Sequence, residues 1–156
     1  MTGCTHNGVL VENDCNNWKI YGNTLIITHT AADSLNFNQD VHFASVWGNS
    51  FHSTATPNCQ GVSIQASGGT NSSNIEIFGN HFTSSPGNTI KYQIEESINI
   101  TTTNNVFDDT VVFDLSPGNA NLVFRNNIGY IGTGDIRTNA GNLEMWNSTA
   151  WVIIGP

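Results

Sequence analysis

One short motif recurs along the chain and constrains its fold more than any other feature. Each copy holds alternating apolar residues, a tight Gly-Asn or Asn-Asn corner, and in most copies a large apolar residue just beyond it. The five copies are WKIYGNTL (18–25), ASVWGNSF (44–51), IEIFGNHF (75–82), INITTTNNVF (98–107) and LVFRNNIG (122–129). Self-similarity of this kind is typical of solenoids, in which each repeat forms one coil and stacked coils bury a continuous core.

The second residue of every corner is asparagine. These anchors are Asn23, Asn49, Asn80, Asn105 and Asn127, and they are separated by 26, 31, 25 and 22 residues. Gly and Asn tolerate the left-handed backbone that a tight corner needs. Stacked amides at such a corner are able to bond along the axis, so we predict a structural asparagine ladder.

Alternation around the anchors predicts which side chains face the core. Three positions relative to the anchor are mostly apolar. Five before it stand Trp18, Ala44, Ile75, Ile100 and Leu122, and three before it stand Ile20, Val46, Ile77, Thr102 and Phe124. Two after it stand Leu25, Phe51, Phe82 and Phe107. A second strand precedes each motif and alternates in the same way, as in Val9 and Val11 or Leu35 and Phe37. Each coil therefore supplies at least two strands.

These patterns predict an all-β fold. We expect a right-handed parallel β-helix, a single-stranded solenoid of about five rungs, over residues 1–131, with its handedness taken from the general rule for parallel crossovers. Residues 132–156 are expected to form a C-terminal β-hairpin cap that serves in oligomerisation. Because the chain opens on a segment already patterned like a rung, we also expect a further part upstream.

Composition excludes several classes of function. Four basic residues stand against twelve acidic ones, and the net charge of −8 disfavours nucleic acid and anionic membrane surfaces as partners. No run of about 18 apolar residues occurs, so membrane insertion is not expected. Cys4, Cys15 and Cys59 match no zinc or redox spacing, and they are expected as free thiols or, alternatively, as one Cys4–Cys15 disulfide.

The repeated x-I-x-I-x-G-N-x-F pattern over roughly residues 7 to 130 resembles the pectate-lyase-like right-handed β-helices, and particularly the distal parts of bacteriophage tail spikes and tail fibres. The segment Leu143–Asn147 followed by Ser148–Val152 resembles the terminal hairpin of such proteins, with Trp146 and Trp151 on its two strands. The resemblance implies a homotrimer on the virion, in the extracellular phage tail. It also implies a structural and receptor-binding role at host cell-surface polysaccharide.

Two alternatives remain open at this point. One is a polysaccharide depolymerase of the β-helix type, either a glycoside hydrolase or a lyase. The other is a bacterial surface adhesin of the same architecture. Turnover of a polysaccharide would distinguish the first alternative from a binding module.

Candidate ligand-binding or interface side chains are the aromatic residues two positions before the anchors. Tyr21, Trp47 and Phe78 should face outward and stack on successive coils. A patch of this kind either packs against a neighbouring subunit or loop or contacts a glycan. Trp146 and Trp151 join them as candidates in the C-terminal segment.

No catalytic residue can be assigned from the sequence. The adjacent pairs Glu95-Glu96 and Asp108-Asp109 would point to opposite faces of a strand, and a glycosidase needs two carboxyl groups roughly 5 to 9 Å apart. Cross-rung partners could come from Asp40, Glu76 or Asp114. The basic residues, of which Arg125 near Asp108 or Asp109 is the best placed, give a lyase little basis.

Metal ions and cofactors are not expected. The five histidines show no metal-ligand spacing, and no phosphate-binding glycine loop occurs. His42 and His52 are expected as surface groups, and His81 as a turn cap.

Overall fold

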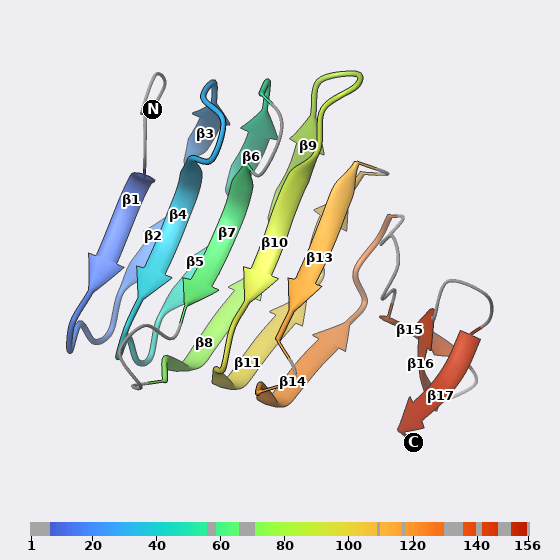
Figure 1. The fold of residues 1–156 in the computed structure, drawn as a ribbon. Helices are drawn as coiled ribbons and strands as arrows, with labels where there is room; N and C mark the ends of the chain where they lie inside the picture. Colours follow the sequence, from blue (N-terminus) through green and yellow to red (C-terminus); the bar gives the residue numbers. More distant parts are fainter. Residues whose placement is uncertain are drawn as a thin grey trace.

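The computed structural model describes residues 7–55, 59–65, 71–108, 110–116, 118–129, 136–139, 142–146 and 151–155, with side chains described between residues 8 and 129. Over these ranges the chain is built from β-strands, and no helix occurs among them that could cross a membrane. Strands from successive repeats lie side by side in parallel sheets (Figure 1). The chain is therefore a parallel β-solenoid of about four turns.

Three parallel sheets form the walls of the solenoid, and each of the first four coils contributes one strand to each sheet. Sheet A contains β1 (Asn7–Glu12), β4 (Asp33–Asn38), β7 (Gln60–Gln65), β10 (Ile90–Ile94) and β13 (Val111–Leu115). Sheet B contains β2 (Lys19–Tyr21), β5 (Ser45–Trp47), β8 (Ser73–Phe78), β11 (Ile98–Thr103) and β14 (Ala120–Arg125). Sheet C contains β3 (Thr24–Ile27), β6 (Ser50–Ser53), β9 (His81–Ser84) and β12 (Val106–Phe107). The all-β parallel β-helix predicted from the repeat is confirmed, although the fifth coil contributes only β13 and β14.

The core fills the space between the three sheets with columns of equivalent side chains. Phe51, Phe82 and Phe107 stack along the axis with ring centroids 4.7 and 4.9 Å apart. Tyr92 meets the last two rings edge to face, and its hydroxyl lies 2.7 Å from Thr102 Oγ1. Because that hydroxyl is fully buried, its pKa is raised well above the usual value.

The corner between sheets B and C has the same geometry in every coil. The residue directly before each anchor has a positive φ. These residues are Gly22, Gly48, Gly79, Asn104 and Asn126. Each anchor amide donates to the next anchor's Oδ1 over 3.0–3.1 Å. The same Oδ1 accepts the backbone N–H of the preceding anchor, so the ladder joins successive coils through side chain and backbone together.

The end coils depart from the predicted inner columns. Trp18 is expected in the core, but 42% of it is exposed, whereas the equivalent Ala44, Ile75 and Ile100 are buried. Ile20 and Leu25 of the same first coil are buried, so the exposure is specific to Trp18, which lies in the turn just before β2. The prediction for Trp18 is therefore wrong.

A separate antiparallel sheet lies beyond the last coil (Figure 1). It consists of β15 (Ile136–Asn139), β16 (Asn142–Trp146) and β17 (Trp151–Gly155), and Trp146 lies opposite Trp151 in the β16–β17 pair. The division at residue 131 and the oligomerisation role of this segment remain predictions. The side chains of Trp146 and Trp151 lie outside the described part of the chain.

Candidate functional site

The outer face of sheet B presents equivalent side chains in register across the coils. One column comprises Lys19, Ser45, Glu76, Thr101 and Val123, and a second comprises Tyr21, Trp47, Phe78, Thr103 and Arg125. Alternate residues of a strand point to the same side, so both columns face outward while Ile20, Val46 and Ile77 between them are buried. The sheet thus carries a long outer surface of mixed aromatic and polar character.

The aromatic part of this surface is a stack of three rings. The ring centroids of Tyr21 and Trp47 are 4.6 Å apart and those of Trp47 and Phe78 5.8 Å, with interplanar angles of 10° and 3°. The faces of the rings therefore cover one another, and Trp47 offers a ligand only its edges. This arrangement favours a role in stabilising the sheet or packing against a neighbour over stacking against a sugar.

Next to the stack, an open groove of about 400 Å³ lies on the outer side of β5, β8 and β11. Its lining includes Phe43, Ser45, Asn74, Glu76, Asn99 and Thr101. Phe43 is 59% exposed, and Glu76 is also exposed. The groove therefore combines an aromatic ring with amides, hydroxyls and one carboxylate.

A second row of asparagines borders the groove at the turn into sheet B. Asn121 Nδ2 donates to Asn99 Oδ1 over 2.9 Å, and Asn99 Nδ2 donates to Asn74 Oδ1 over 3.1 Å. The four asparagines at the equivalent position have φ between 55° and 61°, in the left-handed region that asparagine tolerates: Asn17, Asn74, Asn99 and Asn121. Phe43 occupies the equivalent position in the second coil with φ 57°. A bulky residue there is strained, and strain of this kind points to function.

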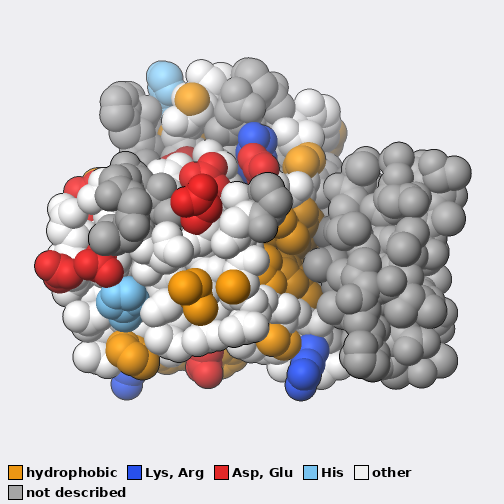
Figure 2. Space-filling view, turned by 60° about the horizontal axis from the view of Figure 1, so that its bottom comes forward, with side chains coloured by type: hydrophobic (Ala, Val, Ile, Leu, Met, Phe, Trp, Pro, Cys, Tyr) orange, Lys and Arg blue, Asp and Glu red, His pale blue; other side chains and the backbone are white. Residues whose placement is uncertain are grey.

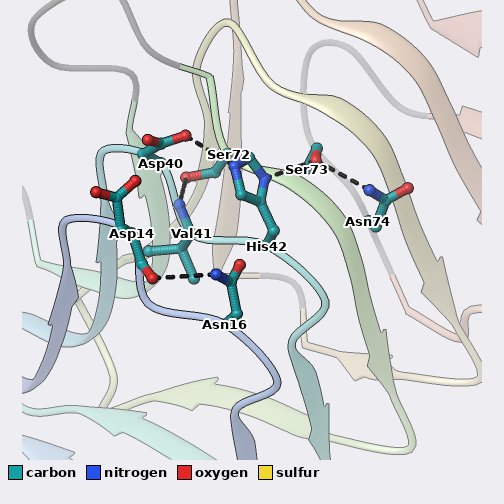
Figure 3. Close-up of polar contacts among 8 residues, drawn as sticks. All are labelled: Asp14, Asn16, Asp40, Val41, His42, Ser72, Ser73 and Asn74. Carbon is teal, nitrogen blue, oxygen red and sulfur yellow. Dashed lines mark hydrogen bonds and ion pairs between the residues drawn. The ribbon is translucent and has the colours of Figure 1, made fainter.

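A carboxylate–histidine cluster lies in the turns that lead from sheet A into sheet B, directly before Phe43 in the sequence (Figure 3). His42 contacts Asp40 Oδ1 through Nε2 over 2.7 Å and Ser73 Oγ through Nδ1 over 2.7 Å. Ser73 Oγ also accepts Asn74 Nδ2 over 3.0 Å, so the cluster is continuous with the amide row. In Figure 2 acidic side chains and a histidine lie together on the face made by the turns between sheets A and B.

Asp14 and Asp40 form a carboxyl pair within this cluster. Interaction with Asp40 raises the pKa of Asp14, while interactions with Asp14 and with His42 lower the pKa of Asp40. Both residues lie nine positions before their anchors, Asn23 and Asn49, and this common offset is the sequence signal that would have revealed the pair.

His42 differs from the sequence expectation of a plain surface group. It is only partly exposed, and its two ring nitrogens connect the turn of the second coil to β8 of the third. The reason is the parallel register, which places Asn16, His42 and Ser73 at equivalent positions of successive coils. His52 makes a similar cross-coil contact, 2.7 Å from Thr83 Oγ1.

The other carboxylates considered from the sequence do not converge on one site. Asp114 forms an ion pair with Lys91 over 3.2 Å, and Asp108 accepts the backbone N–H groups of Ser84 and Thr110. Asp109 lies outside the described residues. In the part of the chain that the structure describes, Arg125 makes no ion pair with Asp108, because that carboxylate is engaged in capping turns.

Cysteine and metal chemistry have little geometric basis in the described ranges. Cys15 and Cys59 are free thiols, and Cys4 lies outside those ranges. Cys59 Sγ lies 3.1 Å from the Ala55 carbonyl oxygen and 3.3 Å from that of His29. No group of three or more metal-ligating side chains occurs among the residues whose structure is described.

The architecture places the chain in the broad class of parallel β-solenoids. The chain matches no protein-family model, no curated protein and no solved structure. Assignment beyond this class depends on the site itself.

Proposed function

We propose that this chain is a structural and receptor-binding module of a phage tail spike or tail fibre, displayed on the virion, and that it contacts host cell-surface polysaccharide through the outer face of sheet B. The observation that carries the proposal is the groove beside Phe43, with its amides, hydroxyls and single carboxylate. Sugars present hydroxyls to such polar groups and apolar C–H faces to aromatic rings. The tail-spike setting rests on the sequence resemblance.

The shape of the site supports a polymeric ligand. The amide row from Asn74 through Asn99 to Asn121 runs along the solenoid axis, one residue per coil. Equivalent polar groups therefore repeat at about 4.8 Å, the spacing of adjacent strands. An extended chain lying along the axis would meet the same kind of group several times.

Polysaccharide binding is tested with the intact chain and immobilised capsular or O-antigen polysaccharides. We expect binding without release of shorter oligosaccharides. Replacing the groove carboxylate in Glu76→Gln should weaken binding about tenfold, the equivalent of one charge-assisted hydrogen bond. Glu96→Gln is the matched control, since Glu96 is exposed but lies outside the groove. Equal affinity of both variants and the unchanged chain would count against the site.

A depolymerase is the alternative, and the carboxyl pair of Asp14 and Asp40 is the observation relevant to it. Glycoside hydrolysis uses two carboxyl groups roughly 5 to 9 Å apart that flank the scissile bond. Neither carboxylate lines the groove in which a sugar would lie, so binding is the better-supported function. Release of oligosaccharides by the chain would favour the enzyme instead, and binding outside a phage particle would fit a surface adhesin.

We further propose that the chain acts as a homotrimer, as the resemblance to tail fibres implies. Edge strands of a sheet present unpaired backbone groups and need cover. Light scattering on a size-exclusion column should give three times the chain mass of 16.9 kDa. A monomeric mass would remove the trimeric arrangement from the proposal.

A further inference from the structure

Phe43 is the position at which the second asparagine row is interrupted. Four of the five coils place asparagine there, and the second coil places an aromatic ring in the same left-handed conformation. Asparagine would be less strained at this position, because its short polar side chain tolerates positive φ. The ring is thus retained at a conformational cost that the fold itself does not require.

The ring of Phe43 is also largely unused by the packing of the described residues. It is 59% exposed, and its aromatic contact is an edge-to-face one with His42 at 6.5 Å between centroids. In contrast, Tyr21, which is also 59% exposed, stacks on Trp47 at 4.6 Å. Phe43 therefore has ring surface available toward the groove that it lines.

The polar groups around the groove determine which sugar would fit. Asn74 and Asn99 provide amides, Ser45 and Thr101 provide hydroxyls, and Glu76 is the charged group among the described residues that line the groove. No lysine or arginine is among them, and the whole chain carries a charge of −8. An acidic sugar would meet repulsion from Glu76, whereas an uncharged sugar would offer hydroxyl donors to it.

We propose that the groove is a subsite for one uncharged pyranose unit, packed on the ring of Phe43 and hydrogen-bonded by Glu76 and by the amides of Asn74 and Asn99. The inference rests on the proposed function, and it adds the chemical class of the sugar and the residue that positions it. The groove volume of about 400 Å³ is sufficient for a unit of this size.

Phe43→Asn is the variant that tests the subsite. It restores the residue found at the equivalent position of the other coils, so the protein should fold with an equal or higher Tm. Leu10→Thr is the matched control, because it removes an exposed apolar side chain from β1 of sheet A, outside the groove and outside sheet B. The probes are neutral maltohexaose, cellohexaose and mannohexaose and acidic oligogalacturonate, measured by saturation-transfer NMR.

We expect saturation transfer to at least one neutral probe, transfer that is at least tenfold weaker in Phe43→Asn, and no change in Leu10→Thr. Preference for oligogalacturonate, or neutral binding that survives Phe43→Asn, overturns the subsite but leaves a polysaccharide-binding function in place. Equal loss in both variants also overturns it. Absence of binding to these probes and to immobilised polysaccharides overturns the proposed function and the subsite together.

Discussion

The corner ladder makes a sharp prediction at its middle member, Asn80, which is only 1% exposed. Asn80 Oδ1 accepts both the backbone N–H and Nδ2 of Asn49 at 3.0 Å. Its own Nδ2 donates to Asn105 Oδ1, to the Val46 carbonyl and to the Phe78 carbonyl over 3.0–3.1 Å. Replacing Asn80 by alanine removes all of these side-chain bonds at once.

The loss of stability in Asn80→Ala follows from the polar groups that are left without a hydrogen-bond partner. The backbone N–H of Asn49 stays buried without an acceptor, at about 1–3 kcal/mol, and each lost side-chain bond adds about 0.5–1.5 kcal/mol. Because several bonds share one atom, their contributions are less than additive, and we expect a loss of about 3–5 kcal/mol for Asn80→Ala. That is a large fraction of the stability of a domain of this size.

Asn23→Ala is the internal control for this prediction. Asn23 is an exposed end of the ladder, and its amide donates only to the Tyr21 carbonyl and to Asn49 Oδ1. We expect a loss below about 1 kcal/mol. Urea unfolding followed by tryptophan fluorescence gives both values, and unchanged m-values would show that the solenoid still unfolds as one unit. Equal losses for Asn80→Ala and Asn23→Ala would refute the ladder as the source of stability.

Two further predictions concern buried polar groups. Burial raises the pKa of Asp33 to about 6, and the hydrogen bond from Asn36 offsets only part of this rise. The contribution of Asp33 to stability is therefore full below about pH 4 and is lost as the pH rises through 6. As the pH rises from 4 to 7.5, the free energy of unfolding of Asp33→Asn should increase relative to that of the unchanged protein by about 1–2 kcal/mol, after solvent screening of the carboxylate. Urea titrations that show the same difference at every pH would contradict this. Tyr92→Phe should cost about 1–2 kcal/mol by leaving Thr102 Oγ1 unpaired in the core. Adding Thr102→Val should recover about half of that loss, and strictly additive thermal-unfolding values would exclude the coupling.

Much of the fold could be predicted because the motif repeats the same local solution. Gly-Asn and Asn-Asn corners demand a left-handed residue, and alternation around them separates inward from outward side chains. The buried columns at Val46, Ile77 and Phe82 agree with that pattern. Trp18 does not, because it lies in the turn before β2, where the alternation of the strand does not yet apply.

The functional surface could be predicted only in part. The outward position of Tyr21, Trp47 and Phe78 followed from alternation, but only the structure showed that their rings cover one another's faces. Alternation around the anchors does not single out Phe43. The signal is its offset, because it lies six positions before Asn49, where the other coils carry asparagine.

The sequence by itself therefore determined the solenoid, its corners and its inner columns, since these depend on local backbone preference and on alternation within one coil. The tertiary structure decided the contact of His42 with Ser73, the second row of asparagines from Asn74 to Asn121, and the groove beside Phe43. These features form between coils. A side chain's partners there come from residues 22 to 31 positions away, and only the register of the stacked strands brings them together.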